Sequence, residues 1–339
     1  MKGSPLSKFL TAGRRTTIII RKLVSAPGSK GPTCFEECEG GRIVKLQGSL
    51  PVIPTPFHNG KVDFDSLAKL FVCGSTGECV SLSLEERLEV MEFAAGNTPP
   101  GKKIVVGLTH TNLEEMVRLA RRAEDLGIAA GLVPCPYYFP NSFPMVLEFF
   151  KALDRGSNLE LVIYDNPLYT KTWLRAEELF AILDACPHAV GVKMTDHDLG
   201  KITALKKNRD AAVFVGDDIV AFRSLLLGAD GSMIIAPAVF PAAYQEVVCL
   251  LRAGSLAQAL RVFSEQILPL IHLFGPGDEV TSTKALFKHL GIFRSDEVRL
   301  PLLPCSPDRL RDVVLAYDYC RSMRSQGCAA PTEAEWRRG

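Results

Sequence analysis

Lys193 is the residue whose chemistry depends most on where the chain places it. It ends the apolar run AVGVK over residues 189–193, so a strand built from that run would carry its amine into a low-dielectric interior. Burial disfavours the ammonium form, and a neutral amine is the nucleophile that forms a Schiff base with a carbonyl group. A simpler interpretation is that Lys193 marks the point where the strand leaves the core for solvent.

A loop of small and hydroxylic residues follows an earlier apolar run. In GSTGE, over residues 74–78, Gly74 and Gly77 permit backbone angles at which successive N–H groups converge on an anion. Ser75 and Thr76 add two hydroxyl donors to the same loop. We expect a carboxylate or a phosphate group to bind there, and the alternative is a plain turn.

Tyrosines also stand where apolar runs end. Tyr137 and Tyr138 follow the run that ends at Cys135, and Tyr164 lies near the end of ELVIYD. A phenol at such a position could relay protons. Aromatic packing beneath the loops would also explain each of them.

Two carboxylates and six histidines complete the set of candidate groups. Asp217 and Asp218 can cap a helix that begins at Ile219, which is the simpler role for them. The histidines show no metal-binding spacing such as H-x-x-x-H, and no carboxylate cluster accompanies them. The sequence therefore predicts a reaction that uses no metal ion.

Short apolar runs, which predict strands, alternate from Gly48 onward with amphipathic stretches of helical length. The expected strands are 49–54, 70–74, 103–108, 129–135, 160–165, 189–194, 212–217 and 231–237. The expected helices between and after them are 82–95, 112–127, 143–155, 175–186, 199–208, 219–230 and 241–254. This alternation favours an α/β fold in which a parallel sheet closes into a (β/α)8 TIM barrel.

An open doubly wound sheet is the alternative fold, although no G-x-G-x-x-G follows an expected strand. A barrel would gather the candidate groups at one face, because the strand ends and the loops after them carry the chemistry of that fold. We expect the barrel over 46–254 and additional C-terminal helices packed on it over 255–325. An N-terminal extension over 1–45 and a polar tail over 326–339 would lie outside it.

The composition is that of an ordinary globular protein. The 339 residues are 47% hydrophobic and carry a formal net charge of +1, which indicates neither a nucleic acid nor an anionic membrane as a partner. No apolar run reaches the roughly 18 residues that a membrane span needs. The first 33 residues hold seven Lys or Arg and no Asp or Glu, which fits a transit peptide, a disordered tail or an over-extended start. We therefore expect a cytoplasmic protein, or a mitochondrial one if this extension is a transit peptide.

Five motifs occur in order, each where an expected strand ends: GSLPVIPTPF, CGSTGE-x3-LS-x2-ER, PYYF, IYDNP and GVKMTD. In combination they resemble the dihydrodipicolinate synthase / N-acetylneuraminate lyase family over about residues 46–323. Members of that family are β/α barrels that bind pyruvate or another 2-oxo acid as a Schiff base. The resemblance implies a lyase of the class I aldolase type, with a covalent imine on Lys193 and no cofactor.

The resemblance also implies roles for individual residues. Lys193 would be the Schiff-base lysine, and Tyr164 would move protons beside it. Ser75 and Tyr138 would extend this proton relay. In the family the second of these commonly reaches the active site of an adjacent subunit, which implies a homodimer or a homotetramer built from dimers.

The loop of residues 74–78 takes a binding role in this comparison. Thr76, with the amides of Ser75 and Thr76, would hold the pyruvate carboxylate, and Gly74 and Gly77 would give the loop its shape. The partners implied are a small-molecule 2-oxo acid and an aldehyde.

The second substrate is less defined. In synthases that condense pyruvate with aspartate semialdehyde, an Arg two residues after the Pro of IYDNP grips the second carboxylate. Here that position is Tyr169, and Lys171 is the nearest cation. Ile219 stands where sialate lyases place a sugar-binding Glu. The sequence therefore predicts a 2-oxo-acid aldolase, with an N-acetylneuraminate lyase-like sugar-acid aldolase as the alternative.

The first crossover of the barrel is unusually short. DSLAKL at 65–70 begins as a helix and FVCGSTGE at 71–78 follows without a turn, whereas a parallel crossover with its helix needs at least about 10–12 residues. The helix could be cut to about one turn, a segment could be lost, or the gene sequence could be imperfect.

A strained crossover beneath Ser75 and Thr76 motivates a second function, that of a catalytically impaired relative serving as a binding or assembly module. A sugar-phosphate isomerase barrel is less favoured, because GSMIIAPAV at 231–239 lacks a Gly-rich phosphate loop.

Overall fold

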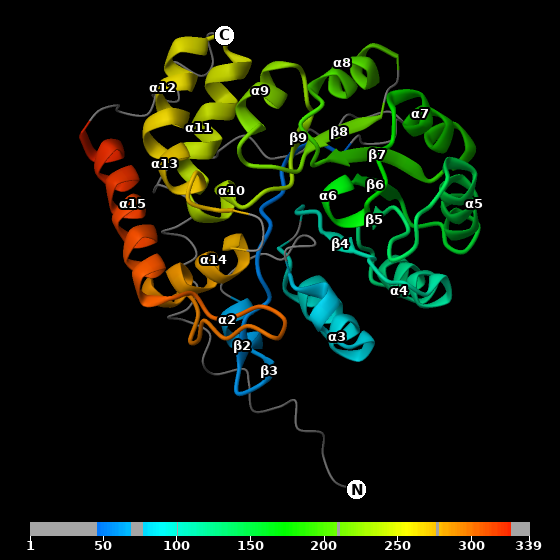
Figure 1. Cartoon of the computed structure of the whole chain (residues 1–339), viewed down its shortest axis with the longest axis horizontal. Helices are drawn as coiled ribbons and strands as arrows, with labels where there is room; N and C mark the ends of the chain where they lie inside the picture. Colours follow the sequence, from blue (N-terminus) through cyan, green and yellow to red (C-terminus); the bar gives the residue numbers. More distant parts are fainter. Residues whose placement is uncertain (1–45, 69–76, 100, 209–210, 276–277, 327–339) are drawn as a thin grey trace, which may run out of the picture.

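The computed structural model describes residues 46–68, 77–99, 101–208, 211–275 and 278–326. Within them one parallel sheet of seven strands curls through the centre of the molecule, in the order β1-β9-β8-β7-β6-β5-β4 (Figure 1). The strands are β1 (Gly48–Ser49), β4 (Val105–Gly107), β5 (Ala130–Pro134), β6 (Leu161–Asp165), β7 (Ala189–Met194), β8 (Ala212–Val215) and β9 (Gly231–Ser232).

The strand order distinguishes between the two predicted folds. A doubly wound sheet reverses its order at a switch point, whereas this sheet runs from β4 to β9 in chain order and then returns to β1. The two end strands are therefore β1 and β4, and the expected second strand, 70–74, lies outside the described residues. The (β/α)8 barrel is confirmed, and the doubly wound alternative is wrong.

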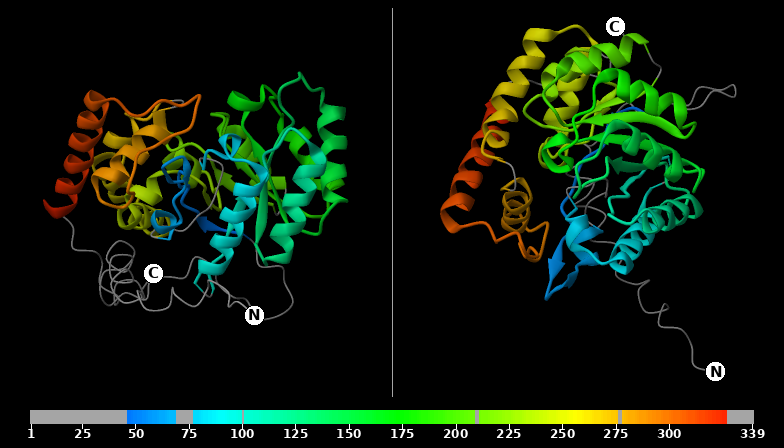
Figure 2. Two further views of the ribbon diagram at one scale, coloured as in Figure 1. Left: turned by 90° about the horizontal axis from the view of Figure 1, so that it is seen from below. Right: turned by 45° about the vertical axis from the view of Figure 1, so that its right-hand side comes forward.

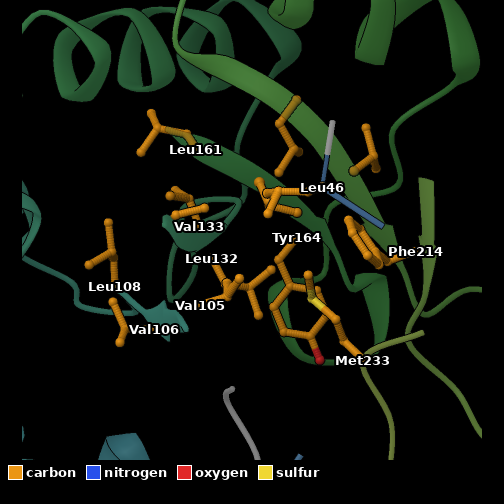
Figure 3. Close-up of a cluster of buried hydrophobic side chains, with 14 of the residues drawn as sticks. Leu46, Val105, Val106, Leu108, Leu132, Val133, Leu161, Tyr164, Phe214 and Met233 are labelled. Carbon is orange, nitrogen blue, oxygen red and sulfur yellow. The ribbon is translucent and has the colours of Figure 1, made fainter. Parts of the chain in front are cut away.

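The barrel strands are short, apolar and buried. Every residue of β5, β6 and β8 is buried, because the sheet has one face on the barrel interior and the other under helices. Figure 3 shows side chains from different strands in one cluster, among them Leu132 of β5, Tyr164 of β6 and Phe214 of β8. The expected first strand, 49–54, is a strand only at its start, although Leu50 and Val52 continue its hydrogen bonds toward β9.

Helices cover the outside of the sheet, as the amphipathic stretches predict (Figure 1). They are α3 (Leu84–Asn97), α4 (Leu113–Asp125), α5 (Phe143–Asp154), α7 (Ala176–Ala185), α8 (Leu199–Asn208), α9 (Ala221–Leu226) and α11 (Pro241–Arg252). Two short helices, α6 (Pro167–Thr170) and α10 (Ala236–Val239), follow β6 and β9 directly. Local signals set the boundaries: Ser83 and Glu86 form a capping box at α3, and Asn112 caps α4.

The last part of the described chain is helical and packs beside the barrel (Figure 2). It contains α12 (Leu256–Gln266), α13 (Leu268–Ile271), α14 (Asp278–His289) and α15 (Pro307–Gln326). One apolar cluster joins these helices to the barrel, with Val215 from β8, Tyr244 from α11 and Phe287 from α14 among its members. None of the described helices combines the length and the apolar character that a membrane crossing requires.

The chain between β1 and α3 is compact where it is described. A hairpin of β2 (Phe57–His58) and β3 (Lys61–Val62) leads into α2, which is the single turn Phe64–Leu67. Asp63 caps this turn by accepting from the backbone N–H of Ser66 at 3.3 Å. A helix of about one turn is thus observed, and the residues that would complete the crossover, 69–76, lie outside the described part of the chain.

Candidate active site

β7 carries Lys193 into the interior of the protein. Lys193 is 2% exposed, and its neighbours Val192 and Met194 are also buried. The parallel register pairs Lys193 with Tyr164 of β6, and Nζ of Lys193 lies 4.3 Å from the centre of the Tyr164 ring. The interpretation that Lys193 marks an exit to solvent is therefore wrong, and the prediction that its amine is buried is confirmed.

Gly216, the residue after β8, leaves room for this amine. A Cβ atom built on Gly216 would lie 2.7 Å from Cε of Lys193 and 2.5 Å from Oγ1 of Thr195. The backbone cannot easily move away, because the N–H of Gly216 donates to the carbonyl of Met194 at 2.6 Å. Any side chain at position 216 would therefore press on the side chain of Lys193.

Apolar packing holds the ring of Tyr164, and a hydrogen bond holds its hydroxyl group. Its ring is 8% exposed and packs in the apolar cluster of the barrel, while its hydroxyl points away from Leu161, which begins its strand (Figure 3). The side-chain amide of Asn166 donates a hydrogen bond to that hydroxyl at 2.8 Å. The phenol and the amine that sequence reasoning assigns to one site are thus neighbours on adjacent strands.

A buried ion-pair cluster holds the ends of these two strands together. Asp165, the last residue of β6, has no exposed surface, and Nζ of Lys201 from α8 donates to its carboxylate at 2.8 Å. The same amine bonds the carboxylate of Asp196, which follows β7. Burial raises the pKa of Asp165 to about 6, with the bond from Lys201 acting in the opposite direction.

Asp217 and Asp218 do not cap a helix that begins at Ile219, as the sequence predicted. Asp217 accepts from the N–H of Ile219 at 2.8 Å, but the helix that follows, α9, begins only at Ala221. Asp218 instead accepts from the N–H groups of Ile235 and Ala236, at 3.1 and 2.7 Å, at the start of α10. It therefore joins the loop after β8 to the loop after β9.

Asp218 is also an electrostatic neighbour of the amine. Burial raises the pKa of Asp218 to about 6, and the two amide hydrogen bonds and the Lys193 amine act in the opposite direction. The Asp218 carboxylate thus binds the start of α10 and also feels the charge of the Lys193 amine.

The loop predicted to bind an anion is described only at its end. Gly74, Ser75 and Thr76 lie outside the described residues, so their binding and relay roles stay predictions. Gly77 is buried, and its carbonyl accepts a hydrogen bond from the hydroxyl of Thr55 at 2.6 Å. The loop therefore ends against the segment that follows β1.

Glu78 fixes the same loop from the other side. It has a left-handed backbone, with a φ of 53°, and its buried carboxylate pairs with Lys284 of α14. Nζ of Lys284 also donates to the carbonyl of Glu297 at 2.8 Å and lies 4.1 Å from the centre of the Phe57 ring. Burial lowers the pKa of Lys284 to about 8, although Glu78 acts in the opposite direction.

Tyr138 does not join the buried group within one chain. It is 85% exposed, has a φ of 86°, and its ring packs edge-on against Phe139 at a centroid distance of 5.1 Å. Its neighbour Tyr137 is partly buried, and burial raises its pKa. The relay role of Tyr138 therefore stays a prediction.

Tyr169, which replaces the Arg that grips the second carboxylate in synthases, lies beside an acidic residue. Tyr169 of α6 is 58% exposed, and its hydroxyl donates to Oε1 of Glu279 in α14 at 3.3 Å. Burial, with Glu279 and Tyr164 nearby, raises the pKa of Tyr169 to about 12. Lys171 turns to the surface, where its Nζ donates to the carbonyl of Leu168 at 2.6 Å.

Sequence reasoning missed three polar residues of this region. Asn166 directly follows IYD and could have been found as a second polar residue on the face of Tyr164, because side chains two apart in a strand share a face. Lys201 and Lys284 lie on helices far along the chain, and nothing in their local sequence indicates their buried carboxylate partners. Within the described ranges, no group of three or more His, Cys, Asp or Glu is placed to hold a metal ion.

Comparison with known proteins matches residues 45–316 to the dihydrodipicolinate synthetase family. The chain is 27% identical over 290 residues to the 4-hydroxy-tetrahydrodipicolinate synthase of Aquifex aeolicus, covering 80% of this chain and 98% of that one. The solved structure of that enzyme from Methylacidiphilum fumariolicum superposes with a TM-score of 0.78 at 24% identity, covering 83% of this chain and 98% of that one. A sialic acid aldolase from Ruminococcus gnavus superposes with a TM-score of 0.76 at 22% identity, with coverage of 83% and 98%.

Proposed function

The chain belongs to the dihydrodipicolinate synthetase family and is an enzyme of the lyase type, and we propose that it makes or breaks a carbon–carbon bond through a Schiff base between Lys193 and a 2-oxo acid such as pyruvate. The observation that carries this proposal is the buried amine of Lys193 against the ring of Tyr164, 4.3 Å away. A similar solved structure is a catalytic-lysine mutant of the R. gnavus sialic acid aldolase, which supports a lysine-based reaction.

The reaction begins when the amine of Lys193 attacks the keto carbon of the 2-oxo acid. The carbonyl oxygen takes up a proton to give a carbinolamine, and loss of water leaves a protonated imine. The imine withdraws electrons, so the neighbouring carbon releases a proton and becomes an enamine nucleophile. The enamine carbon then attacks an aldehyde, and the reverse sequence cleaves such a bond.

Tyr164 is positioned to move the protons of these steps. Its ring centre lies 4.3 Å from the amine and the residue is 8% exposed, so a phenol stands beside the reacting nitrogen with little competition from bulk water. Ser75 and Tyr138 would extend the relay. The amides and hydroxyls of Ser75 and Thr76 would hold the carboxylate of the 2-oxo acid, in the loop between Gly74 and Gly77.

The acceptor aldehyde differs, in this proposal, from aspartate semialdehyde. The contact between Tyr169 and Glu279 puts a phenol and a carboxylate where a synthase would need a cation. A carboxylate-bearing aldehyde would meet repulsion there, whereas a hydroxylated aldehyde would find hydrogen-bond partners. The finer proposal is therefore an aldolase for a neutral aldehyde, and a sugar-acid aldolase is one form of it.

An acceptor-independent experiment tests the central step. Enamine formation exchanges the methyl protons of pyruvate with solvent, so in heavy water the methyl signal of pyruvate in a proton NMR spectrum should disappear when the enzyme is present. Lys193→Ala should abolish this catalysed exchange. Lys207→Ala, which removes an exposed lysine of α8, should leave it unchanged. Equal exchange by wild type and Lys193→Ala would refute the Schiff-base proposal.

A second possibility is the binding or assembly module, which the single-turn α2 motivates. It predicts a folded protein that shows neither methyl exchange nor pyruvate-dependent consumption of any aldehyde. A panel of aldehydes with and without carboxylate groups, followed by loss of pyruvate, separates it from the aldolase. The same panel names the acceptor class.

We also propose that the active form is a dimer or a tetramer. The ring of Tyr138 is exposed, and its backbone is held at a positive φ. Phe139 beside it is 69% exposed, so the pair forms an apolar surface suited to a second copy. Sedimentation velocity should give a mass at least twice that of the chain, and Tyr138→Ala should weaken both assembly and activity.

A further inference from the structure

Asn166 makes a hydrogen bond that the reaction scheme has not used. Its side-chain Nδ2 donates to the hydroxyl oxygen of Tyr164 at 2.8 Å. Asn166 is 1% exposed and Tyr164 is 8% exposed, so bulk water competes little for this bond. Side chains two positions apart in extended chain share a face, so Tyr164 of β6 and Asn166 just after it turn to the same side.

The rest of Asn166 is held in place by the start of α6. Its Oδ1 accepts from the N–H of Tyr169 at 3.4 Å, which makes Asn166 the N-cap of this helix. The hydroxyl of Thr170 donates to its backbone carbonyl at 2.9 Å, and Pro167 fixes the backbone of the first helical position. An amide has an acceptor end and a donor end, so the cap leaves the donor end facing Tyr164.

The hydrogen bond from Asn166 determines where the hydroxyl hydrogen of Tyr164 can point. A phenol has one hydrogen to donate and lone pairs to accept with. Since Asn166 donates to the oxygen, the hydrogen of Tyr164 must point elsewhere. A hydrogen bond is also stronger when its acceptor is charged, so the amide holds the oxygen most firmly after the phenol has lost its proton.

We propose that Asn166 is a positioning residue for the imine chemistry, which orients the hydroxyl of Tyr164 and stabilises it while it lacks its proton. The inference rests on the proposed function. In the step concerned, the carbinolamine hydroxyl takes the proton of Tyr164 and leaves as water, while the nitrogen lone pair forms the C=N bond. The tyrosinate then takes up the proton that the adjacent carbon releases when the imine becomes an enamine.

Two substitutions separate this role from the role in the helix cap. Asn166→Asp keeps an oxygen for the N–H of Tyr169 but removes the donor to Tyr164 and places a negative charge beside it. Thr170→Val removes the hydroxyl bond to the Asn166 backbone and leaves the side-chain amide in place. Asn166→Ser, which is also a good N-cap, takes the place of the Asp variant if that variant does not fold.

The measurement is the initial rate of pyruvate methyl exchange against pyruvate concentration and pH. For Asn166→Asp we expect the maximal rate to fall about 10- to 100-fold, with the pyruvate KM within about threefold of wild type. The alkaline limb of its pH–rate profile should also move, because the charge on the tyrosine oxygen is no longer stabilised. Thr170→Val should keep the wild-type rate and profile, although its melting temperature falls.

The outcomes distinguish this inference from the proposed function. If the wild-type protein catalyses exchange and Asn166→Asp shows the same rate and pH profile, the inference is overturned and the Schiff-base proposal stands. An equal loss in Thr170→Val would also overturn it, because the effect would then come from the cap. Absence of exchange in the wild-type protein would overturn both.

Discussion

Replacing Gly216 by alanine tests whether the position of the Lys193 side chain controls the chemistry. The new methyl group would lie 2.7 Å from Cε of Lys193 and 2.5 Å from Oγ1 of Thr195. Carbon atoms pack at about 3.5–4.0 Å, so Cε would have to move by roughly 1 Å. The backbone offers little relief, because Gly216 is bound to Met194 across the strands.

This displacement sets the expected size of the effect. A reacting atom misplaced by about 1 Å can cost about 100-fold in rate, and the same order of loss is expected for pyruvate methyl exchange in Gly216→Ala. Overpacking of a well-filled core typically costs about 1–3 kcal/mol of unfolding free energy, so the variant should still fold. The loss of rate should therefore exceed what the loss of stability explains.

Gly96 provides the matched control. It lies near the end of α3, and a Cβ atom there would meet nothing within 4 Å. Gly96→Ala should keep the exchange rate and gain up to about 1 kcal/mol of stability, because Ala is the better helix former. The exchange rate and the urea midpoint of both variants would be compared with wild type. A Gly216→Ala protein that folds and keeps the wild-type rate would refute the reasoning.

Three further predictions concern the surroundings of the site. Burial raises the pKa of Asp165 from an ordinary 3.8 to about 6, so the native state holds a proton that the unfolded state loses. The unfolding free energy should therefore fall by roughly 2–3 kcal/mol as pH rises through that window, and Asp165→Asn should lack this fall in urea titrations; parallel curves would contradict it. Lys284→Met should cost about 3–5 kcal/mol by leaving the Glu78 carboxylate buried without its amine, and Glu78→Gln in the same chain should recover most of it; a loss below about 1 kcal/mol would argue against the pair. Tyr169→Arg should lower the KM for a carboxylate-bearing aldehyde about tenfold without changing methyl exchange, and an unchanged KM would remove Tyr169 from the acceptor site.

The fold was accessible from the sequence because its signals are local and repeated. Apolar runs such as ELVIYD and AVGVKM are long enough to specify strands, and seven of the eight expected strands lie in the described sheet. Boundaries were less accessible. The run that begins with SLPVIP keeps its hydrogen bonds to β9 while only two residues are a regular strand, since the chain there bends toward the hairpin.

The site was predictable where chemistry coincides with a strand end, as for Lys193 and Tyr164. It was not predictable where partners come from distant segments. Asp218 was expected to cap the next helix but binds the start of α10, because the loops after β8 and β9 meet only in the closed sheet. Lys284 meets Glu78 across more than two hundred residues, which no local spacing encodes.

The chemical identity of the modified residue tests the central claim most directly. The protein would be mixed with pyruvate, reduced with borohydride to make any imine permanent, digested and mapped by mass spectrometry. We predict a reduced pyruvyl group on the peptide that contains Lys193, absent from Lys193→Ala and from a sample reduced without pyruvate. An unmodified Lys193, or the adduct on another buried amine such as Lys284 or Lys201, would contradict the account.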